Sequence, residues 1–266
     1  MLFPLCLLLQ IFHQMSLINK EDFTQEKPKQ VWAGRRVGIT GASGSLGLAL
    51  SKILRQKGSY VIGLTHKKIS EDQNCKEGPN QWIKWDCGEE EKLKKVLKSL
   101  DVLVLNHGIN PGANLDIDGL NKAIEVNALS NWRLIKYFEE ITYLIKDTSH
   151  PKEVWVNTSE AEIQPAFSPS YEISKRLIGQ LVSFKQSSLN NEGKSKLKIK
   201  KLILGPFKSK LNPIGIMNPD SVAIKIINKS LSNSTLIIVT PNPITYLLMP
   251  LTEFSRGLYF QLFKNK

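Results

Sequence analysis

Cysteine and histidine are scarce in this chain of 266 residues, which contains three of the first and four of the second. Cys6, Cys75 and Cys87 show no pairing pattern, and neither they nor the scattered histidines have the spacing of metal ligands. The composition therefore argues against a disulfide framework and against a zinc site, and no metal is expected. A reducing compartment, the cytoplasm, is the default expectation for such a chain.

Long apolar runs are also scarce, and we find neither internal repeats nor low-complexity blocks. Residues 1–18 are mostly apolar, but polar side chains interrupt them, and their length is near the lower limit of about 17 residues for a membrane span. A basic leader and a small-residue cleavage site are both missing. We interpret residues 1–30 as an apolar segment and a polar linker. The apolar part is a marginal membrane anchor, an interfacial helix or a helix packed on the body.

The charges are not balanced, since the formal net charge is +12 at pH 7. Lysines are densest in residues 193–210, where Phe207 is the single aromatic residue and no nucleic-acid motif is visible, so nucleic acid is not an expected partner. Lysine alternates there with Leu197, Ile199 and Leu202, which favours a solvated approach to a buried strand. A basic surface that faces an anionic membrane or an acidic partner stays open as an alternative.

What the sequence does contain is an alternation of strand-like and helical patterns. Strand character is found at residues 36–40, 61–65, 82–85, 102–105, 154–156, 202–204 and 236–239. Helical periodicity is found at residues 46–54, 89–100, 120–145 and 173–189. This alternation predicts one α/β domain over residues 31–243, a single doubly wound parallel sheet of Rossmann-like type with helices on both faces. Residues 244–266 are predicted to form a C-terminal amphipathic helix that suits a membrane interface, a cover over the substrate pocket or a contact in a homo-oligomer.

A glycine-rich turn separates the first strand from the first helix. Gly41 permits a tight turn, Gly44 lets the backbone approach a pyrophosphate, and Gly47 allows close packing of the helix. Backbone amides at the start of the helix would face the phosphates. The order strand, glycine turn and helix predicts a dinucleotide site. Its expected contacts are Gly41, Ser43, Gly44, Ser45, Leu46 and Gly47.

Tyr171 and Lys175 lie four residues apart in a predicted helix, which places a phenol and an ammonium group on the same face. A free tyrosine has a pKa near 10 and is a poor base at neutral pH. A neighbouring positive charge favours the phenolate and lowers that pKa. The pair is therefore a candidate proton donor and acceptor for carbonyl–alcohol chemistry.

With these residues the chain resembles the short-chain dehydrogenase/reductase family from about residue 35 to residue 239. The resemblance implies hydride transfer through a nicotinamide cofactor. The positions that resemble the family's catalytic residues are Asn127, which would complete a proton relay through water, Ser159, which would orient the substrate oxygen, Tyr171 as acid or base, and Lys175. The positions that resemble its cofactor contacts, besides the glycine turn, are Asp86, Cys87, Asn106, Gly108, Tyr171 and Lys175.

The chain departs from the family pattern at several positions. The spacing of Gly41, Gly44 and Gly47 is more usual in the extended branch, which includes epimerases and dehydratases that act on nucleotide sugars. His107 stands where alanine is usual, and residues 205–206 read Gly-Pro instead of Pro-Gly. Ser159 precedes Tyr171 by one residue fewer than is common, so Thr158 is an alternative for its role.

Cofactor preference is predicted from the end of the second strand. Thr65, His66 and Lys67 contain no carboxylate, and the next one is Glu71. A basic side chain suits a ribose 2′-phosphate, so NADP(H) is expected rather than NAD(H).

The expected substrate is a small carbonyl or alcohol, and side chains from residues 161–169 and 207–219 favour a partly apolar one. Two other classes stay open. One is a cofactor-binding regulator without turnover, because a fold does not determine function. The other is a membrane-associated partner domain of a lipid-modifying enzyme.

Overall fold

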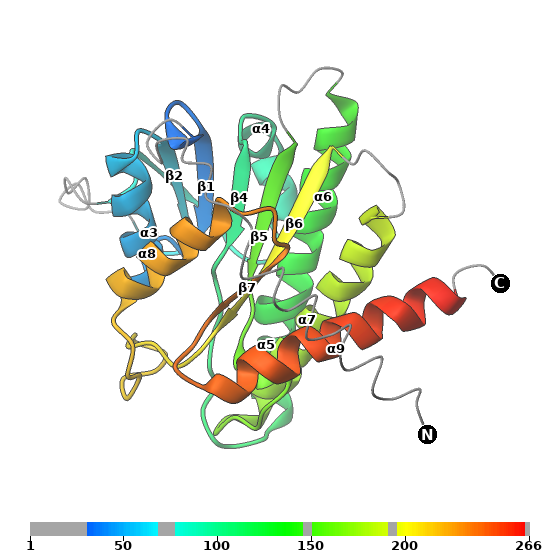
Figure 1. Ribbon diagram of the computed structural model, residues 1–266. Helices are drawn as coiled ribbons and strands as arrows, with labels where there is room; N and C mark the ends of the chain where they lie inside the picture. Colours follow the sequence, from blue (N-terminus) through cyan, green and yellow to red (C-terminus); the bar gives the residue numbers. More distant parts are fainter. Residues whose placement is uncertain (1–30, 69–77, 146–150, 191–195, 264–266) are drawn as a thin grey trace.

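The computed structural model describes residues 31–68, 78–145, 151–190 and 196–263. The apolar segment expected at residues 1–18 lies outside this part of the chain, as does Glu71. Within it, strands form a seven-stranded parallel sheet in the order β3-β2-β1-β4-β5-β6-β7 (Figure 1). The strands are β1 Arg36–Thr40, β2 Tyr60–Thr65, β3 Gln81–Lys84, β4 Val102–Leu105, β5 Lys152–Asn157, β6 Leu197–Leu204 and β7 Leu236–Val239. The predicted doubly wound, Rossmann-like sheet is confirmed.

Helices cover both faces of the sheet, as Figure 1 shows. The first face carries α3 Ser45–Gln56 and α8 Pro219–Ser230. The second carries α4 Lys94–Lys98, α5 Ile117–Ile124, α6 Ser130–Leu144 and α7 Pro169–Asn190. The last helix, α9 Pro243–Phe263, occupies the region where a C-terminal helix is expected and packs on α7 near the carboxyl ends of the strands.

The hydrophobic core has two halves, one on each face of the sheet. In β4, Val102 and Val104 pack with the α3 and α8 side, whereas Leu103 and Leu105 pack with the α6 and α7 side. This alternation follows from the two-residue period of a strand. The apolar run at residues 102–105 is thus buried on both faces, as a central parallel strand requires.

Two helical regions differ from the sequence expectation. The helical pattern at residues 120–145 is two α-helices joined by a π-helical turn, Glu125–Leu129. Helix α8 was not predicted at all. Its signal is present, because Asn218 accepts a hydrogen bond from the amide of Asp220 and Pro219 occupies the first turn.

The expectation that the lysines of residues 193–210 are solvated is wrong for Lys200 and Lys201, which are 2% and 0% exposed. The ammonium group of Lys200 forms an ion pair with Glu153 at 3.3 Å and donates to the carbonyl of Ser230. Buried charges persist only when they are paired and hydrogen-bonded, and these partners come from other elements of the fold.

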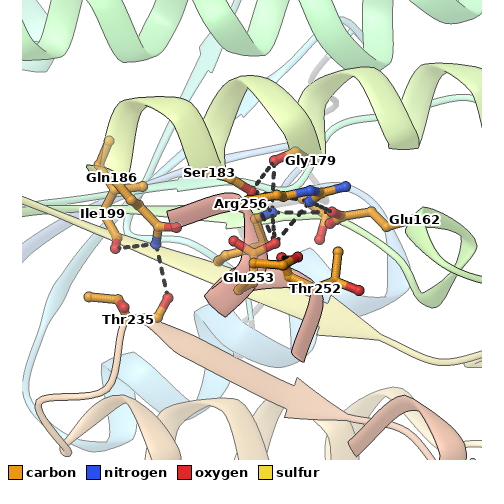
Figure 2. A network of polar contacts seen from close by, with 12 residues as sticks. Glu162, Gly179, Ser183, Gln186, Ile199, Thr235, Thr252, Glu253 and Arg256 are labelled. Atoms are coloured by element: carbon orange, nitrogen blue, oxygen red, sulfur yellow. Dashed lines mark hydrogen bonds and ion pairs between the residues drawn. The ribbon is translucent and has the colours of Figure 1, made fainter. Parts of the chain in front are cut away.

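Lys201 lies at the centre of a buried polar network that attaches α9 to the body. Its Nζ donates to Glu162 Oε2 at 3.1 Å, Ser183 Oγ at 2.8 Å and Glu253 Oε1 at 2.9 Å. Figure 2 shows Glu253 and Arg256 of α9 directed into this network beside α7. The carboxylates come from two separate segments, the turn after β5 and α9, so the network holds α9 in one orientation.

Candidate functional site

The glycine turn after β1 forms a tight cradle at the carboxyl edge of the sheet. Gly41 has a φ of 62°, in the left-handed region that favours glycine. A Cβ atom on Gly47 would lie 2.5 Å from the carbonyl oxygen of Gly41, so the start of α3 packs directly on the turn. Gly44 is exposed and precedes the first turn of α3. A pyrophosphate requires a backbone that it can approach closely and amide groups at a helix N-terminus that face it. The glycine turn and the start of α3 provide both, so they fit a dinucleotide.

The other predicted residues of the cradle lie around it in different ways. Ser45 and Leu46 begin α3, and the Leu46 side chain is buried, so it is the backbone of Leu46 that faces the turn. The hydroxyl groups of Ser43 and Thr65 are 2.9 Å apart, which joins the glycine turn to the end of β2. The amide of Lys67 also donates to the Thr65 hydroxyl, at 3.2 Å.

His66 and Lys67 are exposed just after β2, where they can meet a ribose or its phosphate. Asp86, after β3, is also exposed. Cys87 is partly buried on the α6 side of the core, where burial raises the pKa of its thiol despite a hydrogen bond with Ser130. An adenine contact through this pair stays a prediction.

Thr40, at the end of β1, was not among the predicted site residues, although it directly precedes the glycine turn. Its hydroxyl accepts hydrogen bonds from the amides of Asn106 at 2.9 Å and His107 at 3.3 Å. The His107 imidazole is 2.8 Å from the same hydroxyl and packs edge-on to Trp85. Burial and the charge of Lys175 lower the pKa of His107 to about 3. The ring is therefore neutral at physiological pH, and it packs where a smaller residue is usual.

A short chain of hydrogen bonds connects the cradle with Lys175. Asn106 Nδ2 donates to the carbonyl of Gly41 at 3.4 Å, and Asn157 Nδ2 donates to Asn106 Oδ1 at 2.9 Å. Lys175 Nζ then donates to the carbonyl of Asn157 at 3.0 Å. Asn157 was also missed, although polar residues at the carboxyl ends of adjacent parallel strands are a usable signal.

Tyr171 and Lys175 lie together on α7, as the four-residue spacing predicts. Lys175 Nζ is 5.7 Å from the centre of the Tyr171 ring. Burial lowers the pKa of Lys175 to about 8, against the opposing charge of Glu162. Burial also raises the pKa of Tyr171, and a hydrogen bond with Ser159 opposes this only in part. The expected lowering of the Tyr171 pKa is therefore wrong, because desolvation of the phenolate dominates.

The two candidates for the substrate-orienting hydroxyl are distinguished by direction. Thr158 Oγ1 donates to the carbonyl of Leu202 at 3.1 Å, so it is directed into the sheet. Ser159 accepts a hydrogen bond from the amide of Ala161 and contacts the Tyr171 hydroxyl. Ser159 is thus the hydroxyl in contact with Tyr171.

Asn127 sits in the π-helical turn and is fully buried. Its Oδ1 accepts from the amide of Ile109 at 2.8 Å, and its Nδ2 donates to the carbonyl of Ile109 and to Ser174 Oγ, both at 2.9 Å. A Cβ atom on Gly108 would lie 3.0 Å from Asn127 Oδ1 and 3.9 Å from Lys175 Nζ. Asn127, the predicted relay residue, and Lys175 therefore lie on either side of Gly108. The position of Asn127 in a π-helical turn is in keeping with a functional role, because such turns are frequent at functional sites.

Sequence comparison identifies a family over the region that contains these residues. A sequence model described as the NAD dependent epimerase/dehydratase family matches residues 37–178, which contain the glycine turn, Ser159, Tyr171 and Lys175. The monoglucosyldiacylglycerol epimerase of Synechocystis sp. is 43% identical over 237 residues, which are 88% of this chain. The chain spans 56% of the length of that protein.

Solved structures show the same fold at low identity. A short-chain dehydrogenase from Burkholderia cenocepacia in complex with NADP has a TM-score of 0.69, is 15% identical, and is matched over 87% of this chain and 98% of its own. RhlG of Pseudomonas aeruginosa, in an NADP active-site complex, has a TM-score of 0.65 at 19% identity, over 79% and 95% of the two chains. At such identities these likenesses establish the architecture alone.

Proposed function

Because the chain belongs to the NAD dependent epimerase/dehydratase family, we propose that it binds a nicotinamide dinucleotide at the glycine cradle and inverts one hydroxyl-bearing carbon of a sugar headgroup on a glycerolipid. The observation that carries the proposal is the 43% identity with an epimerase of that substrate class, over a region that includes the whole site. Ser159, Tyr171 and Lys175, which meet in the structure, have the chemistry that such a reaction needs.

The reaction has two opposite halves. The bound cofactor supplies a hydride acceptor and donor. In the first half, Tyr171 would accept the proton of the substrate hydroxyl while the carbon that bears it is oxidised to a ketone. In the second half, Tyr171 would return the proton to the same oxygen while the ketone is reduced on its opposite face. Substrate and product differ only in configuration, so cofactor and protein end as they began.

The remaining residues prepare these steps. Ser159 donates a hydrogen bond to the substrate oxygen, where negative charge develops. Lys175, as an ammonium ion, stabilises the Tyr171 phenolate and binds the ribose hydroxyls. The carbonyl–alcohol interconversion expected from the sequence is each half of the proposed reaction. The net result of the two halves is the inversion of one carbon of the headgroup.

A direct test supplies the purified protein with monoglucosyldiacylglycerol in detergent micelles and a small amount of NADP⁺ or NAD⁺. Proton NMR of the headgroup should then show a hexosyl lipid with one inverted carbon, without a net change in nicotinamide absorbance. Net consumption of NADPH with carbonyl substrates would instead support a reductase. Cofactor binding with no turnover of either kind would support a regulator.

Cofactor affinity is expected to depend on pH through Lys175, whose pKa of about 8 lies far below the ordinary lysine value. The ammonium form prevails below pH 8, and it is lost as pH rises through that value. Binding to ribose hydroxyls favours the charged form, so the dissociation constant for NADPH should rise with pH above about 8. Fluorescence titration from pH 6.5 to 9.5 measures this, and a flat profile in wild-type protein would contradict it. Lys175→Met should show weak binding with no such dependence.

We further propose a preference for NADPH over NADH. The exposed side chains of His66 and Lys67 follow β2, and the described residues 31–68 contain no carboxylate that could repel a 2′-phosphate. Lys67→Glu should weaken NADPH binding by about tenfold or more, since it replaces a favourable charge with a repulsive one. The same change should leave NADH binding within about threefold. Lys95→Glu, at an exposed position on α4, is the matched control for charge. Equal or tighter NADH binding by the wild-type protein would contradict the preference.

A further inference from the structure

Helix α9 carries a continuous apolar stripe on its outer side. We define the apolar face of α9 as the exposed large apolar side chains Ile244, Leu247, Leu248, Leu251, Phe254, Leu258, Tyr259 and Leu262. With 3.6 residues per turn, these positions fall on one side of the helix. Exposed apolar surface of this extent on one element marks an interaction site.

The opposite side of α9 is fixed to the body. Thr245 and Met249 are fully buried there. Glu253 and Arg256 belong to the ion network of Lys201, and Arg256 also donates to Ser183 Oγ at 3.2 Å (Figure 2). The helix therefore cannot turn its apolar face inward without breaking buried ion pairs.

The start of α9 is also bound to the segment that carries Ser159. Gln164 Nε2 donates to Thr245 Oγ1, and Asn242 Nδ2 donates to Gln164 Oε1, both at 2.8 Å. Glu160, the residue after Ser159, accepts from Thr240 at 2.7 Å. These hydrogen bonds thus fix the position of the apolar face of α9 relative to the Ser159 hydroxyl.

A second group of exposed apolar residues lies in the loop that follows β6, at the same edge of the sheet. Strands β6 and β7 are neighbours, and their last residues, Leu204 and Val239, are paired. The loop to α8 follows β6, and α9 follows β7. This loop exposes Leu211, Ile214 and Ile216 beside the exposed lysines Lys208 and Lys210. In Figure 1 the loop and the start of α9 lie at the same end of the molecule.

We propose that the apolar face of α9 and the tip of the loop at residues 208–216 dock on an anionic lipid bilayer. This proposal rests on the proposed function, since a lipid-linked headgroup would then reach Tyr171 from the surface on which the protein sits. In the described residues no helix is long and apolar enough to cross a membrane, which suits a helix lying in the interface.

Charge favours lipid over a second copy of this chain. Lys208 and Lys210 border the exposed apolar residues of the loop, Lys264 and Lys266 follow α9 in the sequence, and the whole chain carries +12. Basic residues beside apolar ones are attracted to anionic lipid, at roughly 1 kcal/mol for each lysine near the surface. A second copy would bring the same positive charges to the contact and repel them.

Flotation of the full-length protein with vesicles tests the proposal. One vesicle set contains phosphatidylcholine alone, and the other contains phosphatidylcholine and phosphatidylglycerol. Wild-type protein should float with the second set, and added salt should weaken this. The double variant Leu251→Ser with Phe254→Ser should lose at least about tenfold in partitioning, because two anchoring side chains are removed. Lys208→Gln with Lys210→Gln should lose about fivefold per lysine, with less salt dependence.

The matched control is Leu48→Ser with Leu144→Ser, two exposed leucines on α3 and α6 that should leave flotation unchanged. NADPH binding checks the fold of every variant. Unchanged flotation of the Leu251→Ser, Phe254→Ser variant would overturn the proposal. So would a wild-type dimer that this variant abolishes without any vesicle binding, since the face would then contact a second copy. If micellar headgroup inversion fails while flotation depends on α9, docking stands and the proposed function falls.

Discussion

Replacing Tyr171 by phenylalanine is expected to lower kcat for headgroup inversion by about 10²–10⁴-fold, the usual contribution of a positioned acid or base. The phenol oxygen is the atom in contact with Ser159, and the substitution removes only that atom. The ring that lies 5.7 Å from Lys175 Nζ is retained. NADPH affinity should therefore stay within about threefold, which separates a chemical defect from a binding defect. Micellar turnover and fluorescence titration measure the two quantities.

Tyr246→Phe is the matched control, because the Tyr246 hydroxyl donates only to backbone carbonyls of Ile238 and Thr240 among the contacts described. This variant should keep wild-type turnover. Retention of full activity by Tyr171→Phe would exclude Tyr171 as the acid or base. A protein that binds NADPH but turns over no substrate, with or without the substitution, would favour the regulatory alternative.

Replacing Lys201 by methionine is expected to reduce the free energy of unfolding by about 3–5 kcal/mol, the cost of leaving a buried charge uncompensated. Lys201 is 0% exposed, and it pairs with Glu162 and Glu253, of which Glu162 is also buried. Methionine has a similar length but neutralises neither carboxylate. Arg256 remains beside both, at 3.4 Å from Glu162 and 2.9 Å from Glu253, so the loss should fall short of complete unfolding. Urea denaturation followed by circular dichroism measures the difference.

Lys198→Met is the control for this substitution, since Lys198 lies on the same strand with an exposed bond to Asn233. It should change the free energy of unfolding by no more than about 0.5 kcal/mol. Equal effects of the two changes would show that the buried network contributes little. A second check uses Lys201→Met with Glu253→Gln, which removes one uncompensated carboxylate and should recover part of the loss.

Local patterns predicted much of this molecule. The run at residues 102–105 is apolar at every position, which indicates burial on both faces, and β4 is the central strand with core residues on each side. The three-residue spacing of Gly41, Gly44 and Gly47, read as a departure toward the extended branch, agrees with the epimerase/dehydratase family that the chain matches. The Tyr171–Lys175 spacing placed both groups on one side of α7 because the helix repeat is a local property.

Other features depended on partners distant in the sequence. Lysine at residues 200 and 201 looks solvated when only its neighbours are considered, yet its compensating groups come from β5, from the turn after Ser159 and from α9. The pKa of Tyr171 could not be predicted from Lys175 alone, because the desolvation that raises it comes from the whole packed site.

The sequence by itself determined the alternation of strands and helices apart from α8, the glycine cradle and the positions of the candidate acid–base residues, since each depends on residues within a few positions of one another. Only the tertiary structure decided that Ser159 rather than Thr158 contacts Tyr171, that Asn127 and Lys175 flank Gly108, and that α9 is fixed with its apolar face outward. These facts follow from packing and from the pairing of buried charges, which bring together segments up to about 100 residues apart, such as Glu162 and Arg256.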